Sequence, residues 1–300
     1  MNDHRSARSS ALASEPLRIA GPRPGFVVGT LQSIRDIHAQ RELLGMLTRR
    51  ELKAKYKDST LGFLWSLLKP LALLLIYYVA IGRFLGAARE IPDFAVFIYA
   101  GLTAWTLYSE IIASGTASIV VNAGLIKKVY LPREVFPLSV VGSALFNFTI
   151  QLGVLVAATV AVGAFPTGSR WLYLPLSLAV LLVLATAAAF LLSAVNVYLR
   201  DVQYLVEILL MIFFWASPIV YSWALASGEI GRWLQELYLA NPMTLVILGF
   251  QETFWVSGDG ELKPDHLAER LGVALLVGIL LLWLCQRVFA RLQANFAQEL

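Results

Sequence analysis

The chain has 300 residues, of which 58% are hydrophobic and only 15% are charged, and its net charge is +4 at pH 7. Ordinary soluble domains carry about 25% charged residues, so this composition excludes a pair of soluble domains and indicates a polytopic membrane protein. Cys285 is the only cysteine and there are three histidines, which argues against a disulfide within the chain and against a metal site. We attribute the small positive charge to residues beside the membrane and expect no nucleic-acid partner.

The N-terminal part divides into two stretches of different composition. Residues 1–30 are rich in Ser, Ala, Arg, Pro and Gly, which is typical of a disordered tail. From Leu31 to Leu47 apolar residues recur at helical spacing with charged residues between them. Residues 31–60 are therefore expected to form an amphipathic helix in the membrane interface and a basic segment after it. A short helix packed on a soluble partner is the alternative, and no signal peptide is expected.

The basic segment directly precedes the first long apolar run. Its cationic residues are Arg49, Arg50, Lys53, Lys55 and Lys57. Basic residues this close to a span prefer the cytoplasm, which orients the first span. The same charges could attract anionic lipid headgroups or an anionic substrate, so we treat them as candidates for a cytoplasmic substrate-access site, although orientation alone explains them.

Six apolar runs are each long enough to cross a bilayer, which takes roughly 20 residues. They cover approximately residues 61–84, 94–121, 135–162, 172–195, 202–221 and 267–288. We therefore expect an all-α integral membrane protein with six transmembrane helices at 61–290 and a cytoplasmic tail at 291–300. An even number of spans keeps both termini in the cytoplasm, which suits Arg287 and Arg291 near the end of the last run.

The longest connection, residues 222–266, contains a semi-apolar piece that is interrupted by Asn241-Pro242. Its apolar part after the proline has only about 14 residues, which is short for a crossing. We expect a re-entrant outer element, buried against protein, between the fifth and sixth spans. A seventh span is the alternative, but it would export the C-terminal arginines.

Lys69 and Glu110 are ionisable residues well inside the first two predicted spans. Lys69 lies about two turns into the first span, where it either snorkels to the near surface or faces a wet interior that accepts anions, and Tyr77 shares a similar face. Glu110, near the middle of the second span, is either a functional residue or a buried structural glutamate bonded to a neighbouring helix.

Two side-chain stripes follow in later spans. The third span carries a polar seam that we expect to hold spans together, made of Ser143, Asn147 and Gln151. The fifth span begins after the charged cytoplasmic turn Arg200-Asp201 and carries an aromatic and polar stripe, made of Tyr204, Glu207, Met211, Phe214, Pro218 and Tyr221, with Trp215 beside it. The stripe is either a pore wall or an interfacial aromatic belt.

A short basic segment, residues 122–137, joins the second and third spans. Lys127, Lys128 and Arg133 place it at the cytoplasmic surface. Pro132 and Pro137 disfavour helix at the residues before them, which predicts a short helix, a break and a new helix start. The segment is either an ordinary positive-inside loop or a docking element for a cytoplasmic partner.

No Walker loop, G-x-G-x-x-G turn, H-E-x-x-H motif or nucleophile elbow occurs in the sequence. We therefore expect no catalytic residues, no cofactor in this chain and no enzyme activity. If transport needs ATP, another chain must supply its hydrolysis.

Four segments, taken in order, resemble the membrane subunits of ABC type-2 exporters for polysaccharides and polyol phosphates, the family of O-antigen, capsule and teichoic-acid permeases. They are KYKDSTLGFLWSLLKPLALLLIYY (Lys55 to Tyr78), NAGLIKKVYLPREVFPL (Asn122 to Leu138), NVYLRDVQYLVEILL (Asn196 to Leu210) with SPIVY (Ser217 to Tyr221), and NPMT (Asn241 to Thr244). The resemblance covers roughly residues 31 to 290 and leaves out the first thirty.

The resemblance implies a homodimer joined to two copies of a separate subunit that binds ATP and Mg. It implies a coupling helix seated on that subunit, formed by Leu125, Ile126, Lys127, Lys128, Val129, Tyr130, Leu131, Pro132, Arg133 and Glu134. It also implies that the first and fifth spans line the export channel, with Lys69 and Tyr77 opposite Glu207, Met211, Phe214, Trp215 and Tyr221.

By this resemblance the chain exports a lipid-linked polysaccharide, with O-antigen the expected cargo, across the bacterial cytoplasmic (inner) membrane and contacts membrane lipids. An exporter of a drug or small lipid is the alternative within the same transporter class. A membrane glycosyltransferase would need a larger carboxylate-bearing domain, and a proton-coupled transporter using Glu110 and Glu207 would be expected to show an internal repeat.

Overall fold

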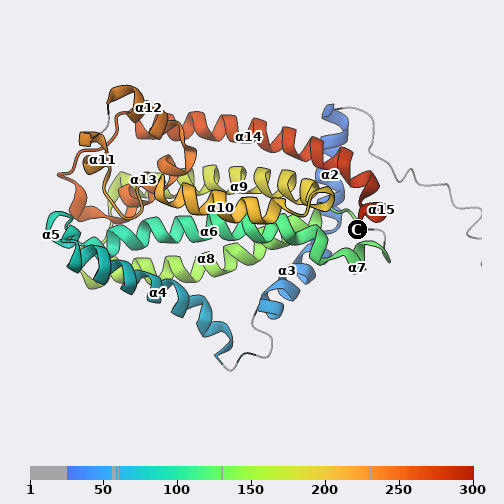
Figure 1. Cartoon of the computed structure of the whole chain (residues 1–300), viewed down its shortest axis with the longest axis horizontal. Coiled ribbons are helices and arrows are strands. Elements are labelled where there is room, and N and C mark those ends of the chain that lie inside the picture. Colours follow the sequence, from blue (N-terminus) through green and yellow to red (C-terminus); the bar gives the residue numbers. More distant parts are fainter. Residues whose placement is uncertain (1–25, 56–58, 60, 130, 230) are drawn as a thin grey trace, which may run out of the picture.

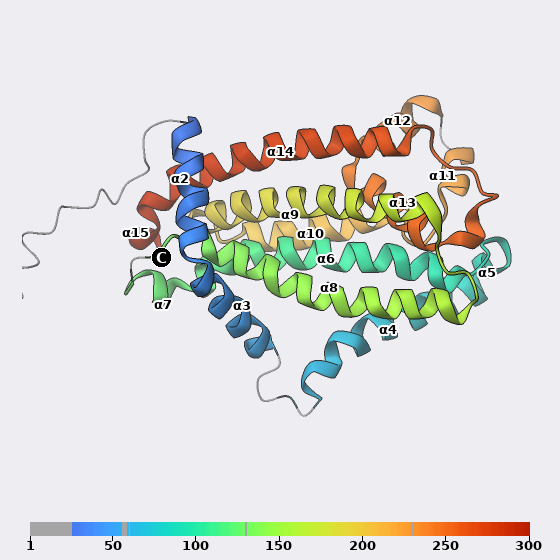
Figure 2. The same ribbon diagram turned by 180° about the vertical axis from the view of Figure 1, so that it is seen from behind.

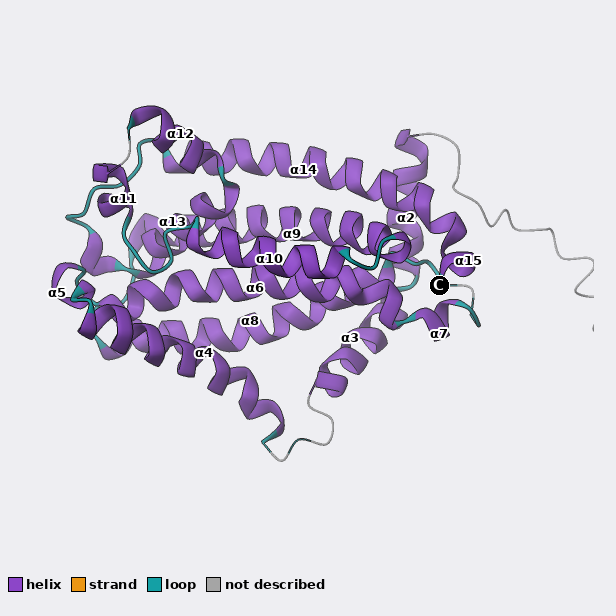
Figure 3. Ribbon diagram, in the orientation of Figure 1, coloured by secondary structure: helices purple, strands orange, loops and turns teal. Residues whose placement is uncertain are grey.

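The computed structural model describes residues 26–55, 59, 61–129, 131–229 and 231–300. The described residues form helices joined by turns, without a strand among them (Figure 3). The first helices are α2 (Phe26–Ala39), α3 (Arg41–Lys55), η1 (Gly62–Leu64), α4 (Trp65–Tyr77) with its π-helical continuation η2 (Tyr78–Phe84), α5 (Ala87–Glu90), α6 (Phe94–Val121), α7 (Ala123–Ile126) and α8 (Val135–Ala161). The later helices are η3 (Gly168–Leu172), α9 (Tyr173–Tyr198), α10 (Val202–Trp215), α11 (Trp223–Glu229), α12 (Arg232–Ala240), α13 (Pro242–Phe254), η4 (Val256–Gly258), α14 (Leu267–Leu292), η5 (Gln293–Asn295) and α15 (Phe296–Glu299).

Five helices in the described residues are long and apolar enough to cross a membrane. They are Trp65–Phe84, Phe94–Val121, Val135–Ala161, Gly168–Tyr198 and Leu267–Glu299. These match the first four predicted spans and the last, so the expectation of an all-α, multi-pass membrane protein is confirmed.

The fifth predicted span differs from the expectation because its helix is shorter. α10 ends at Trp215 instead of continuing to Tyr221, and at 14 residues it is too short to count among the spanning helices. Pro218 explains the end, since proline lacks an N–H and disfavours helix at the residue before it. The carbonyl of Pro218 instead accepts a hydrogen bond of 2.7 Å from the side-chain amide of Gln251 in α13.

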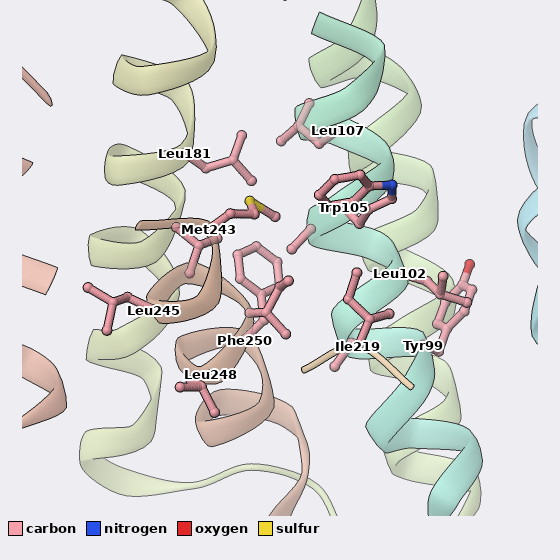
Figure 4. Close-up of a cluster of buried hydrophobic side chains, with 14 of the residues drawn as sticks. Tyr99, Leu102, Trp105, Leu107, Leu181, Ile219, Met243, Leu245, Leu248 and Phe250 are labelled. Atoms are coloured by element: carbon pink, nitrogen blue, oxygen red, sulfur yellow. The ribbon is translucent and has the colours of Figure 1, made fainter. Parts of the chain in front are cut away.

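The long helices run side by side, with α6 in the middle of the bundle (Figure 1). α6 packs on α8, α9, α10 and α13, and its residues Phe97, Tyr99 and Ile111 are fully buried. Figure 4 shows how α13 inserts Met243 and Phe250 between α6 and α9. This core fixes the positions of the elements that surround it.

The bundle has two distinct ends. α2, α3, α7, α15 and the C-terminus lie at one end, and α5, α11 and α12 lie at the other (Figures 1 and 2). Seen in either view, α2 runs crosswise to the long helices. Since Lys127, Lys128, Arg200 and Arg291 lie at the first end, we call it the basic end.

The N-terminal helix predicted from Leu31 is in fact two helices. α2 begins at Phe26, inside the stretch expected to be a tail, and a turn at Gln40 separates it from α3. α3 packs on α8 through the buried side chain of Leu47. The rest of the predicted tail, residues 1–25, lies outside the described residues.

The outer connection contains α11, α12 and α13. The α13 helix starts as its sequence predicts, because the Asn241 side chain accepts a hydrogen bond of 3.0 Å from the amide of Met243 and Pro242 occupies the first turn. Nearly all of α13 is buried against α6, α9 and α14. Burial against protein agrees with the expected outer element, while its re-entrant path through a membrane stays a prediction.

Candidate functional site

The 122–137 segment projects from the basic end of the bundle (Figure 1). Its helical part is only α7, which is followed by a turn in which the amide of Val129 donates to the carbonyl of Leu125 over 3.0 Å. Leu125–Glu134 is therefore not one continuous helix. The predicted break is present, and α8 begins after it at Val135.

The segment has a buried side and an exposed basic side. Ile126 is buried, whereas Lys127, Lys128 and Val129 are exposed. Leu131, Pro132 and Arg133 are half-buried, Glu134 is buried, and Tyr130 lies outside the described residues. The two lysines thus give this turn a positively charged outer side above an apolar anchor, Ile126.

The C-terminal residues hold the base of this segment. The Arg133 guanidinium donates to the backbone carbonyl of Gln293, and it lies 6.0 Å from the ring of Phe296. The side-chain amide of Gln293 donates to Glu134 over 3.2 Å. Glu134 is only 5% exposed, and this burial raises its pKa, although its hydrogen bonds and the charges of Arg133 and Arg287 oppose the change.

A second apolar core lies beneath these contacts at the basic end. We call it the end cluster, and it consists of Leu47, Ile119, Ile126, Val135, Phe136, Phe190, Ala194, Val197, Phe289 and Phe296. Its members come from α3, α6, α7, α8, α9, α14 and α15. A displacement of α7 is thereby linked by packing to the long helices.

The predicted channel-lining residues fall into two groups. Tyr77 of α4 and Phe214 of α10 stack with their ring centroids 5.8 Å apart, and Phe214 also meets Trp105 and Trp215, each at 5.5 Å. Phe214 is buried by these rings, so it does not face an open surface of the single chain. The Tyr221 hydroxyl donates to the carbonyl of Trp215 over 2.8 Å.

The other channel candidates point to different places. Glu207, Met211 and Trp215 are exposed along α10. Lys69 lines a cavity on the side of α4 that faces α6 and α8, and its place in a channel opposite these residues stays a prediction. Figure 2 shows that the start of α4 diverges from the bundle.

This cavity has a volume of about 620 Å³. Its walls come from α4, α6, α8, the end of α3 and Ser59. Its lining residues are Lys55, Ser59, Trp65, Ser66, Lys69, Pro70, Leu73, Thr106, Glu110, Asn147 and Gln151. Glu110 forms an ion pair with Lys55 and accepts a hydrogen bond of 2.9 Å from the amide of Asn147. The sequence marks Lys69, Glu110, Asn147 and Gln151 as unusual residues for a span, but no local pattern shows that they line one cavity.

The basic residues near α3 do not form a single cluster. Arg50 donates to the side-chain carbonyl of Asn122 and pairs with Glu51 at 3.1 Å, and Lys55 pairs with Glu110. Arg49 and Lys53 are exposed, whereas Lys57 lies outside the described residues.

The turn Arg200-Asp201 is exposed at the same end of the bundle. Over the described residues, no group of three His, Cys, Asp or Glu side chains could hold a metal ion.

Known proteins resemble this chain over most of its length. The family model of the ABC-2 type transporter matches residues 42–255. The chain belongs to this family. An ABC-2 permease is the membrane subunit of an ABC transporter, and its ATP-binding partner is a separate subunit.

Curated relatives of the permease include two kinds of export protein. The O-antigen export system permease protein RfbA of Myxococcus xanthus is 32% identical over 271 residues, which are 90% of this chain and 100% of the relative. The protein of the same name from Klebsiella pneumoniae is 29% identical over 86% of this chain and 95% of its own length. The polysialic acid transport protein KpsM of Escherichia coli is 27% identical over 81% of this chain and 93% of its own length.

Proposed function

We propose that the permease exports a lipid-linked polysaccharide, with O-antigen the expected cargo, across the bacterial inner membrane. The observation that carries the proposal is the similarity to an O-antigen export permease. The match spans 90% of this chain and the full length of that relative. The relative named for polysialic acid transport supports a polysaccharide as the general class of cargo.

The working assembly is a homodimer with two ATP-binding subunits that hold ATP and Mg. α4 and α10 meet through Tyr77 and Phe214, and α10 leaves Met211 62% exposed and Trp215 54% exposed in the single chain. A second copy would bring two such faces together around a channel. Aromatic rings suit a sliding glycan because they stack on the apolar face of a pyranose without selecting one linkage.

The permease crosses the membrane six times with both termini in the cytoplasm. α10 together with residues 216–221 forms the fifth crossing, since its non-helical part is largely buried and its carbonyls find partners such as Gln251. The basic end is then cytoplasmic by the positive-inside rule. α2 lies in the membrane interface on that side, and Arg49 and Lys53 meet the diphosphate of the lipid-linked substrate.

The 122–137 segment couples ATP hydrolysis to transport by seating Lys127 and Lys128 on the ATP-binding subunit. The shape of the segment supports this role, because an exposed basic turn stands on a buried anchor, Ile126. Movement of the partner would reach the long helices through the end cluster.

The proposal is tested by deleting the chain in its host and measuring surface polysaccharide on gels. Loss of long-chain glycan from the surface, its accumulation inside the cell and recovery on complementation are expected. Full-length surface polysaccharide in the deletion strain would overturn the proposal and would favour the alternative cargo, a drug or small lipid.

A further inference from the structure

We propose that the cavity between α4, α6 and α8 is a sugar-binding site that holds a pyranose unit of the transported glycan. The inference rests on the proposed polysaccharide cargo, but it concerns the first turns of α4, from Trp65 to Leu73, and not Tyr77, which lies further along the helix and stacks on Phe214. The cavity volume of about 620 Å³ lies within the range of roughly 300–1,000 Å³ usual for small-ligand sites.

The lining combines one aromatic wall with several polar side chains. Trp65, which is 41% exposed, stands on one wall at the start of α4. The amides of Asn147 and Gln151, the carboxylate of Glu110 and the hydroxyl of Thr106 come from α6 and α8. An indole ring for the apolar face of a sugar and amides with a carboxylate for its hydroxyls match the two kinds of surface that a pyranose presents.

Gln151 gives the most specific indication of the ligand. It is only 4% exposed, and its side-chain oxygen is buried without a hydrogen-bond partner among the described residues. An unpaired buried acceptor is unfavourable unless a donor arrives at some stage of the working cycle. The terminal torsion of a glutamine is soft, so a small rotation would let this oxygen accept a hydrogen bond from a ligand in the cavity.

The charges argue for a hydroxylated ligand over a phosphate. Lys55 is already paired with Glu110, so its charge is neutralised within the site. The Glu110 carboxylate and the Gln151 oxygen are both acceptors, and both would repel the oxygens of an ionised phosphate, which has no protons to donate. Sugar hydroxyls can donate to these acceptors and can accept from the ammonium of Lys69.

The site also explains why polar residues occur at these positions of membrane helices. Asn147 and Gln151 lie one turn apart on α8, and Glu110 faces them from α6. Packing alone would be served equally well by small apolar residues, and each buried polar group in a span needs a partner. Asn147 bonds Glu110, whereas the Gln151 oxygen remains available for a ligand.

The test uses the permease with its ATP-binding subunit in nanodiscs, and the probe is the host's own surface glycan freed of lipid by mild acid. Binding is followed by calorimetry for the wild type, for Gln151→Met and Trp65→Leu, and for Thr149→Val. Thr149 is a matched control because it is exposed on α8 and bonds only the carbonyl of Leu145 in its own helix.

We expect Gln151→Met and Trp65→Leu each to weaken glycan binding about tenfold or more, while Thr149→Val leaves it unchanged. Gln151→Met should also melt at the same or a higher temperature than the wild type, because it removes an unpaired buried oxygen. Lower affinity without lower stability is a result that a purely structural glutamine would not give.

Three results would overturn the proposal. The first is wild-type affinity in both cavity variants. The second is a wild-type complex that binds no glycan although its host loses surface polysaccharide on deletion, in which case the sugar site fails and the export function stands. The third is binding of farnesyl diphosphate that is abolished by Lys69→Gln, because the cavity would then be a phosphate site.

Discussion

Arg133 and Gln293 join two distant parts of the chain, since the guanidinium of Arg133 donates a hydrogen bond to the backbone carbonyl of Gln293, 160 residues later. Phe296 lies beside them, fully buried in the end cluster. The C-terminal residues thus form the support on which the projecting 122–137 segment rests. A tail expected only to follow the last span has a structural role at the basic end.

Replacing Phe296 by alanine should lower the free energy of unfolding by about 3–5 kcal/mol, because a fully buried ring leaves a cavity between Tyr198 and Phe289. Thermal melting of the purified protein in mild detergent measures the effect. Leu300→Ala, which changes a half-buried side chain in the same tail, should cost much less. Equal melting temperatures for Phe296→Ala and the wild type would show that the tail does not brace this end.

The buried carboxyl of Glu134 predicts a specific pH dependence. Burial raises its pKa in the folded protein above the ordinary value of 4.5, so the folded state binds the proton more tightly than the unfolded state. Its protonated form therefore stabilises the fold at low pH, and this contribution is lost as the pH rises through the folded pKa.

Melting curves of the wild type and Glu134→Gln between pH 4 and pH 8 test this dependence. The difference in melting temperature should grow in favour of Glu134→Gln as the pH rises. Glu42→Gln, an exposed change at the same end, serves as the control and should give no such trend. A difference that is constant with pH would contradict the assignment.

Gly115 allows α6 and α9 to approach closely. A Cβ atom at this position would lie 2.7 Å from the Cβ of Ala189, so Gly115→Ala should destabilise the fold by about 1–3 kcal/mol, which thermal melting in detergent would measure. Adding Ala189→Gly should restore much of the loss. Gly153→Ala offers a matched control, since no atom lies within 4 Å of the place its added methyl group would take, and it should be neutral or slightly stabilising.

Gln251 holds the non-helical part of the fifth predicted span. Gln251→Met would leave the Pro218 carbonyl without a partner in a buried position, at a cost of about 1–3 kcal/mol. Proteolysis of the variant in detergent should reveal faster cleavage after α10. Cleavage at the wild-type rate would mean that this hydrogen bond does not hold the segment.

Sequence patterns were sufficient for the long helices and insufficient where a helix ends early. Apolar length predicted the matching spans because it directly reflects the thickness of a bilayer. The end of α10 at Trp215 follows from Pro218, a local signal, whereas the buried path of the residues after it depends on a distant partner, Gln251, which no local pattern reveals. The apolar length of residues 202–221 therefore does not keep this stretch helical to its end.

The candidate sites likewise combine features that local sequence patterns predict with contacts that only the fold creates. The break at Pro132 was predictable from proline chemistry, whereas the contact of Arg133 with Gln293 was not, because the two residues meet only through the fold. Lys69 and Glu110 were recognised as unusual residues for a membrane span. Their meeting in one cavity depends on the divergence of α4 from the bundle, which is a tertiary property.

The coupling role of the 122–137 segment is tested most directly by the binding of a separate ATP-binding subunit to the exposed turn that carries Lys127 and Lys128. The permease is purified in mild detergent from its native membrane, and the proteins that copurify in equal amount are identified for the wild type, for Lys127→Glu/Lys128→Glu and for Arg232→Glu. The last variant reverses an exposed charge at the opposite end of the bundle.

We expect a stoichiometric ATP-binding subunit with the wild type and with Arg232→Glu, and its loss with the double variant, which should still melt like the wild type. Retention of the subunit by a folded Lys127→Glu/Lys128→Glu protein would contradict the assignment of this turn as the docking surface.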